Sequence, residues 1–113
     1  MTNNKNSTRY YSSRQERRIA KQLGGKQTAN SGAPKFTAGD VKTQHFLIEA
    51  KTVTKEQKSF TIQRDWIYKN REEAFAMGKP FSAIAIDFGD GEQHYLIDER
   101  LFKDLVEYEE GAV

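Results

Sequence analysis

The stretch from His45 to Val53 is the feature that most constrains the fold of this chain. A nearly continuous apolar run fills it, made of Phe46, Leu47, Ile48 and Ala50. Such a run is typical of a strand that is buried on both faces of a sheet. A buried strand requires other strands beside it and helices packed against it. We therefore expect residues 45–53 to form a central strand of a layered domain.

Helical and extended patterns alternate along the rest of the chain. Apolar spacing predicts helices at about residues 14–23, 63–77 and 101–108. Ser13 and Glu16 have the spacing of a capping box at the start of the first helix. Extended patterns occur at 26–29, 40–43, 82–88 and 93–97, and Gly89-Asp90-Gly91 predicts a hairpin between the last two. The expected order is αβββαββα, an α/β (α+β) domain with a mixed sheet of about five strands flanked by helices.

The length of 113 residues corresponds to one domain. The first dozen residues are polar and have no apolar periodicity, so we expect a flexible basic arm at 1–12 and a single domain at 13–113.

The composition excludes several kinds of chemistry. The chain has no cysteine, which excludes disulfides, zinc–thiolate sites, iron–sulfur clusters and cysteine nucleophiles. No apolar run approaches the roughly 18 residues of a membrane span, and the polar N-terminus lacks the apolar region of a signal peptide. We expect a soluble protein of the cytoplasm with no membrane association.

Charge is distributed unevenly along the chain. Residues 1–58 contain 12 Lys and Arg against 4 Asp and Glu, a net charge of +8, whereas residues 59–113 contain 6 against 12, a net charge of −6. A basic half of this kind indicates a polyanionic partner. The acids within that half, which are Glu16, Asp40, Glu49 and Glu56, then need an explanation.

Asp40, Glu49 and Lys51 are suited to phosphodiester chemistry. Side chains two apart on a strand share a face, so Glu49 and Lys51 project together. Asp40 reaches the same face if residues 40–43 and 45–53 pair as a hairpin. Carboxylates of this kind hold Mg²⁺, which stabilises charge on a phosphate, and an ammonium group positions the attacking water.

Simpler interpretations exist for each of these residues. Glu49 and Lys51 also fit a solvated pair on a strand face, although the apolar residues around Glu49 favour an interior strand, where charges are rare. Asp40 after Gly39 also fits a turn. A capping box alone explains Glu16, and Glu56 fits an ordinary surface charge.

Three segments together resemble a known family. They are Ser31-Gly32-Ala33, Gly39-Asp40-Val41 and Phe46-Leu47-Ile48-Glu49-Ala50-Lys51-Thr52. Their order is similar to that of the PD-(D/E)XK nuclease superfamily, and within it to archaeal-type Holliday junction resolvases and their small phage-encoded relatives. The resemblance covers about residues 14–98 and implies a restriction-endonuclease-like fold. The chain departs from the family pattern in having Gly39 where proline often stands, and it is short for a resolvase.

The resemblance implies a role for each matching residue. Asp40 and Glu49 would be the main metal ligands, completed by Glu16, and Lys51 would be the catalytic lysine. Ser31 would lie near the scissile phosphate, and Gln63 would approach the site from the start of the second helix. The implied cofactor is Mg²⁺, for which Mn²⁺ would substitute.

Basic residues near these positions in the sequence are expected to bind DNA phosphates. They are Arg9, Arg14, Arg17, Arg18, Lys21, Lys26, Lys35 and Lys42. No recognition-helix or zinc pattern predicts base readout, so we expect selectivity for DNA structure.

The sequence therefore predicts a Mg²⁺-dependent endonuclease that cleaves branched DNA such as Holliday junctions, in recombination or phage DNA processing. Symmetric resolution requires two sites, so we expect a homodimer with the acidic half at its interface. If the gene belongs to a phage, the protein would act in the bacterial host cytoplasm. The alternatives are an endonuclease of the same fold that nicks or cuts without junction preference, and a catalytically silent DNA-binding protein.

Overall fold

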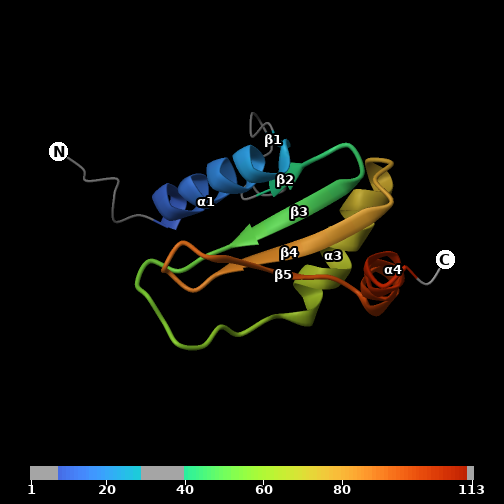
Figure 1. Cartoon of the computed structure of the whole chain (residues 1–113). Helices are drawn as coiled ribbons and strands as arrows, with labels where there is room; N and C mark the ends of the chain where they lie inside the picture. Colours follow the sequence, from blue (N-terminus) through green and yellow to red (C-terminus); the bar gives the residue numbers. More distant parts are fainter. Residues whose placement is uncertain (1–7, 29–39, 112–113) are drawn as a thin grey trace.

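One mixed sheet with the strand order β1-β2-β3-β4-β5 organises the part of the chain that the computed structural model describes, residues 8–28 and 40–111 (Figure 1). Its strands are β1 (Lys26–Gln27), β2 (Asp40–Lys42), β3 (Phe46–Lys51), β4 (Phe81–Asp87) and β5 (Gln93–Leu96). The helices are α1 (Thr8–Leu23), α3 (Arg64–Ala76) and α4 (Glu99–Glu109). The mixed α/β architecture and the number of strands expected from the sequence are both confirmed.

Strand β3 lies at the centre of the sheet, as its apolar sequence predicts. It pairs antiparallel with β2 on one side and parallel with β4 on the other. A parallel pair needs a crossover connection, which the chain provides through α3. The expected hairpin at Gly89-Asp90-Gly91 joins β4 to the antiparallel β5, and Gly89 and Gly91 both have positive φ angles, of 101° and 89°.

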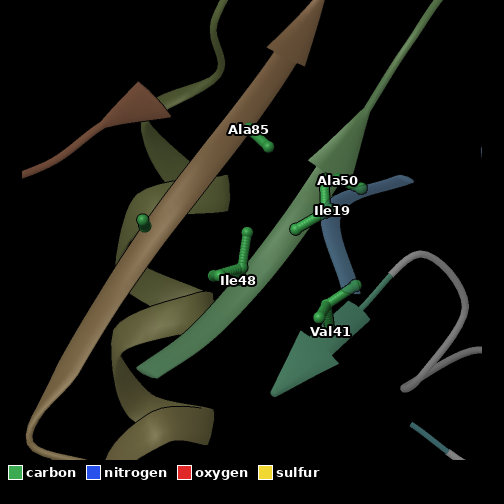
Figure 2. Packing of buried hydrophobic residues seen from close by; sticks show 6 residues of the cluster. Ile19, Val41, Ile48, Ala50 and Ala85 are labelled. Carbon is green, nitrogen blue, oxygen red and sulfur yellow. The ribbon is translucent and has the colours of Figure 1, made fainter. Parts of the chain in front are cut away.

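The face of the sheet toward α1 carries the apolar core. Ile19 of α1 is fully buried and packs with buried side chains of three strands, which are Val41, Ile48, Ala50, Ala83 and Ala85 (Figure 2). Small alanines on β3 and β4 leave room for the helix to approach the sheet closely. Burial of this apolar surface holds α1 in place.

Helix α3 covers the opposite face of β3 and β4 (Figure 1). It buries Asn70 and Ala74. The Asn70 side chain donates hydrogen bonds through Nδ2 to the carbonyl of Leu47, at 3.3 Å, and to that of Ala83, at 3.0 Å. These bonds fix the position of α3 over the two parallel strands.

The first helix is longer than the sequence predicts. It begins at Thr8 instead of Arg14, so residues 8–12, which we assigned to a flexible arm, are helical. Ser13 lies within the helix and is not its cap, and the predicted capping box with Glu16 is wrong. Local interactions favour the extra turn, because the Tyr10 ring lies 5.8 Å from the Arg14 guanidinium one turn later.

No helix within residues 8–28 and 40–111 combines the length and the apolar character that a membrane-spanning helix needs.

Candidate active site

Asp40 and Glu49 lie side by side on the face of the sheet that α3 partly covers. Asp40 begins β2 and is the direct cross-strand partner of Glu49 on β3. Directly opposed residues of an antiparallel pair project to the same face. Asp40 is buried, with 5% of its surface exposed, and the Glu49 side chain is 18% exposed. The structure thus brings together the two carboxylates that the sequence predicts as metal ligands.

Lys51 completes this group from the same face of β3. Its Nζ lies 2.9 Å from a carboxylate oxygen of Glu49 and 4.3 Å from the centre of the Trp66 ring on α3. Trp66 in turn contacts Phe60 edge-on, with ring centroids 6.4 Å apart. The ammonium group is therefore held between a carboxylate and an aromatic face, which restricts its position.

The Asp40 carboxyl is the most perturbed titratable group of the site. Its pKa is raised from 3.8 to about 8. Burial is the largest cause, because a carboxylate loses its hydration inside the protein. Nearby carboxylates raise the pKa further, in the order Glu49, Glu73 and Glu16, and Lys51 lowers it. Negative charge at this site thus exceeds what Lys51 neutralises.

Glu73 is a member of the site that sequence reasoning missed. It lies on α3, and its pKa is raised by burial and by the charge of Glu49, with Lys69 acting in the opposite direction. The spacing in the sequence indicates it only once Trp66 is known to contact Lys51. Glu73 follows Trp66 by seven residues, or about two helical turns, so the two side chains share a flank of α3.

Glu16 lies on α1 and takes part in the site at longer range. One of its carboxylate oxygens accepts a hydrogen bond of 3.2 Å from the side chain of Gln27 on β1. Its charge is the smallest of the three carboxylate contributions to the raised pKa of Asp40. Gln27 pairs with Val41, which packs on the α1 side of the sheet. Glu16 therefore lies on that side, away from the face of the Asp40 side chain, and it acts on Asp40 through its charge.

Two predicted site residues do not join this group. Ser31 falls outside the described residues. Gln63 lies exposed at the N-terminal boundary of α3, and its side chain makes no capping hydrogen bond. In the described part of the chain, no hydrogen bond or ion pair connects Gln63 to Asp40, Glu49 or Lys51.

The donor chemistry of the site fits a magnesium ion. Within residues 8–28 and 40–111, no group of three Asp, Glu, His or Cys side chains is arranged to hold a metal ion together. Mg²⁺ is usually bound through one or two carboxylates, with water and substrate phosphate oxygens as the remaining ligands. Asp40 and Glu49 provide such a pair, and a divalent cation would offset the excess negative charge that raises the pKa of Asp40.

The predicted DNA-binding residues divide between the two faces of the sheet. Lys26 on β1 and Lys42 on β2 are cross-strand partners, and Lys42 shares the face of Asp40 because the two are separated by two positions on one strand. The basic side chains of α1 lie exposed on the other side, and they are Arg14, Arg17, Arg18 and Lys21. Lys35 and the Arg9 side chain are outside the described parts.

The chain was compared with protein-family models, with curated proteins and with solved structures, and nothing matches it. A pair of carboxylates suited to a hard cation, a restrained ammonium group and nearby basic side chains are together suited to hydrolysing a phosphodiester.

Proposed function

We propose that this protein is a Mg²⁺-dependent DNA endonuclease that cleaves branched DNA. One observation carries the proposal. Asp40 and Glu49 face each other across β2 and β3, and Lys51 contacts Glu49 from the same face. A buried carboxyl beside other carboxylates lowers stability, so its presence supports a functional role.

In the proposed mechanism, Asp40 and Glu49 hold the metal ion, and Glu73 and Glu16 add negative charge around it. When bound, Mg²⁺ supplies Lewis-acid stabilisation of the charge that develops on the phosphate. Lys51 orients the attacking water and remains positioned by Glu49 and the Trp66 ring. In-line attack on phosphorus breaks the bond to the 3′ oxygen, leaving a 5′-phosphate and a 3′-hydroxyl.

The surrounding charges support DNA as the substrate. Lys26 and Lys42 are close to the carboxylate pair on the same face of the sheet, where ammonium groups would contact backbone phosphates. Such contacts do not distinguish one base sequence from another. We therefore propose recognition of DNA shape, with a four-way junction as the preferred substrate.

We further propose a homodimer, because two symmetric cuts require two sites. Helix α4 is the element best suited to the interface. It buries none of its residues, and Phe102, Leu105 and Tyr108 are 55%, 46% and 77% exposed. Beside it lies an apolar groove of about 460 Å³, lined by residues that include Leu23, Phe46, Ile48, Tyr95, Leu101 and Leu105. Apolar surface of this kind is typical of a protein interface.

The proposal is tested by incubating the purified protein with a synthetic four-way junction, a flap, a linear duplex and a single strand, in Mg²⁺ or in EDTA. We expect Mg²⁺-dependent cleavage that is fastest on the junction. Asp40→Asn and Lys51→Ala should reduce the rate by at least about a hundredfold, a typical loss for a catalytic group. Glu56→Gln, a change at an exposed acid outside the site, is the matched control.

Each alternative has its own outcome in this experiment. Equal cleavage of junction and linear duplex would replace the junction-selective enzyme with a non-selective or nicking endonuclease. Binding without cleavage of any substrate would support the silent DNA-binding protein. Cleavage that persists in Asp40→Asn would contradict the assignment of the site.

A further inference from the structure

A cavity lined by arginines lies at the carboxyl ends of β3 and β4, on the side of the sheet that carries α1. Its volume is about 360 Å³. Helix α1 contributes Arg14, Arg17 and Arg18 to its lining, together with Tyr11. In sheets with parallel strands, ligands commonly bind beyond the carboxyl ends of those strands. Here the parallel pair is β3 and β4.

None of these three guanidinium groups forms an ion pair with a carboxylate within residues 8–28 and 40–111. Among the described residues, the ion pairs within 4.0 Å are Lys51 with Glu49 and Lys103 with Glu107. Arg14 lies over the Tyr10 ring, and Arg18 donates a hydrogen bond to the carbonyl of Gly91. The cavity therefore collects three positive charges that take part in no ion pair within the described part of the chain.

The acidic residues of the cavity wall are engaged elsewhere. Asp87 is buried, and one of its oxygens accepts hydrogen bonds from the backbone N–H groups of Gly89 and Gly91, at 2.8 and 3.1 Å. Its other oxygen accepts one of 2.8 Å from Gln93. Asp90 accepts a hydrogen bond of 3.1 Å from the N–H of Glu92. Both carboxylates thus stabilise the turn between β4 and β5 and leave the arginines available to an external anion.

The wall on the side of this turn is shaped to fit Arg18. Gly91 has a φ of 89°, and a Cβ placed on it would lie 2.5 Å from the Arg18 guanidinium. Glycine is the residue that both permits this backbone conformation and leaves room for the side chain. The hydrogen bond from Arg18 to the carbonyl of Gly91 then holds the arginine at the cavity.

The cavity is connected to the candidate active site through the end of β3. Gln15 is buried and lines the same cavity as the arginines, and its Nε2 donates a hydrogen bond of 3.0 Å to the backbone carbonyl of Lys51. The next two residues, Thr52 and Val53, line the cavity. A nucleic-acid strand that passes over the end of β3 would thus meet Lys51 on one face of the sheet and the arginines on the other.

We propose that this cavity binds one phosphate group of the DNA strand whose scissile phosphate lies at Asp40 and Glu49. The inference rests on the proposed function in naming a DNA strand as the ligand. The binding of a phosphate is inferred from the arginines, which form no ion pair within the described residues. Guanidinium groups bind phosphate with paired hydrogen bonds, which makes arginine the favoured residue for a recessed phosphate site. The phosphate belongs either to a strand end or to the backbone where it bends at a branch.

The test measures binding in EDTA with the Asp40→Asn variant as the parent protein, so that cleavage plays no part. Short single strands carrying a 5′-phosphate, a 3′-phosphate or hydroxyl ends are titrated by fluorescence anisotropy at several salt concentrations. Arg17→Ala is the main variant, because the Arg17 side chain makes no ion pair within the described residues, and Arg14→Ala is the second. Arg100→Ala on α4 is the control for loss of one positive charge.

We expect Arg17→Ala to weaken binding about tenfold, the effect of one charged hydrogen-bonding group. The slope of the logarithm of affinity against the logarithm of salt concentration should fall by roughly one, as when one phosphate contact is lost. If the affinity of the Asp40→Asn parent depends on a terminal phosphate and adding Arg17→Ala removes that dependence, the site takes a strand end. If all strands are weakened equally, it takes a backbone phosphate.

The proposal would be overturned if Arg17→Ala and Arg14→Ala both bound DNA with the same affinity and the same salt dependence as the control Arg100→Ala. Because no metal or cleavage is involved, this result would leave the proposed nuclease activity standing. Conversely, tight phosphate-dependent binding by a protein that cuts no substrate would retain the phosphate site and reject the nuclease.

Discussion

Asp40 and Glu49 are direct cross-strand partners on β2 and β3, with both carboxylates on one face of the sheet. Like charges in this relationship oppose folding. Among the described residues, the ammonium group within ion-pair distance of this pair is that of Lys51, which contacts Glu49 at 2.9 Å. The carboxylates that the proposed chemistry needs therefore lower the stability of the fold. The protonation state of Asp40 determines how large this effect is, and it can be measured.

The stability of the protein without metal should depend on the protonation of Asp40. Its pKa is about 8 in the folded protein, against roughly 3.9 in an unfolded chain. Between these values the folded state binds more protons, so the free energy of unfolding should fall as pH rises from about 4 to about 8. The slope contributed by one such group is at most about 1.4 kcal/mol per pH unit. Urea denaturation in EDTA across this pH range measures it.

Asp40→Asn is the variant that isolates this effect, because it removes the titrating group and nearly preserves the shape of the side chain. Its free energy of unfolding should fall less steeply between pH 5 and pH 8 than that of the wild type. Glu73, whose pKa is also raised, contributes in the same direction and remains in the variant. Equal slopes in the two proteins would contradict a protonated Asp40.

Magnesium should stabilise the protein more at high pH than at low pH. A cation bound at Asp40 and Glu49 displaces the proton from Asp40, so metal affinity rises with pH up to about 8. At a concentration of one hundred times the dissociation constant, binding adds about 2.7 kcal/mol, which corresponds to an increase of about 10 degrees in Tm for a chain of this length. Calorimetry in MgCl₂ and in EDTA at pH 6 and pH 8 measures the shift. A shift that is independent of pH, or that persists in Glu49→Gln, would rule out this site.

Glu73 and its neighbour Glu72 form a matched pair on α3. The charge of Glu73 raises the pKa of Asp40, whereas Glu72 is exposed and is absent from the groups that perturb Asp40. Glu73→Gln should therefore lower the pKa of Asp40, and Glu72→Gln should leave it unchanged. Carboxyl titration followed by NMR measures both. A larger decrease in the pKa of Asp40 in Glu72→Gln than in Glu73→Gln would show that Glu73 does not face the site.

The strands of this fold can be predicted from the sequence because the features that mark a strand lie within a few neighbouring residues. The run 46–51 and the Gly89-Asp90-Gly91 turn define β3 and the β4–β5 hairpin within one or two residues, since side-chain alternation and turn residues act over a few positions. Asp40 was expected on the face of Glu49 on the condition that residues 40–43 and 45–53 pair as a hairpin. The structure shows this pairing, and a short connection between adjacent strands favours it.

Two features could not be predicted from the sequence, namely the place of Glu73 in the site and the start of α1, because they depend on contacts made in the folded protein. Glu73 belongs to the site because α3 packs on β3 and β4, and no spacing within residues 40–51 contains that information. The start of α1 was misplaced because Ser13 carries a cap signal, while Tyr10 and Tyr11 continue the helix through contacts with Arg14 and with each other. Local cap preferences amount to only about 1 kcal/mol, so packing overrides them.

Helix α4 should hold the proposed dimer together. Leu105→Glu places a charge on its apolar face beside the groove and should produce a monomer, as measured by light scattering after size-exclusion chromatography. Arg100→Glu adds the same side chain at an exposed position of α4 and should remain dimeric. A wild-type protein that is monomeric at micromolar concentration, or a Leu105→Glu variant that stays dimeric, would contradict this interface.

Asn70 should be the residue of α3 whose loss most weakens the fold. It is 1% exposed, and its Nδ2 donates to the carbonyls of Leu47 and Ala83 on the two parallel strands. Asn70→Ala leaves both carbonyls without this donor inside the protein and should lower the free energy of unfolding by about 2–3 kcal/mol. Glu72→Ala, an exposed change on the same helix, should alter it by less than about 0.5 kcal/mol. Urea denaturation of the two variants measures the difference, and similar values would show that Asn70 does not anchor α3 to the sheet.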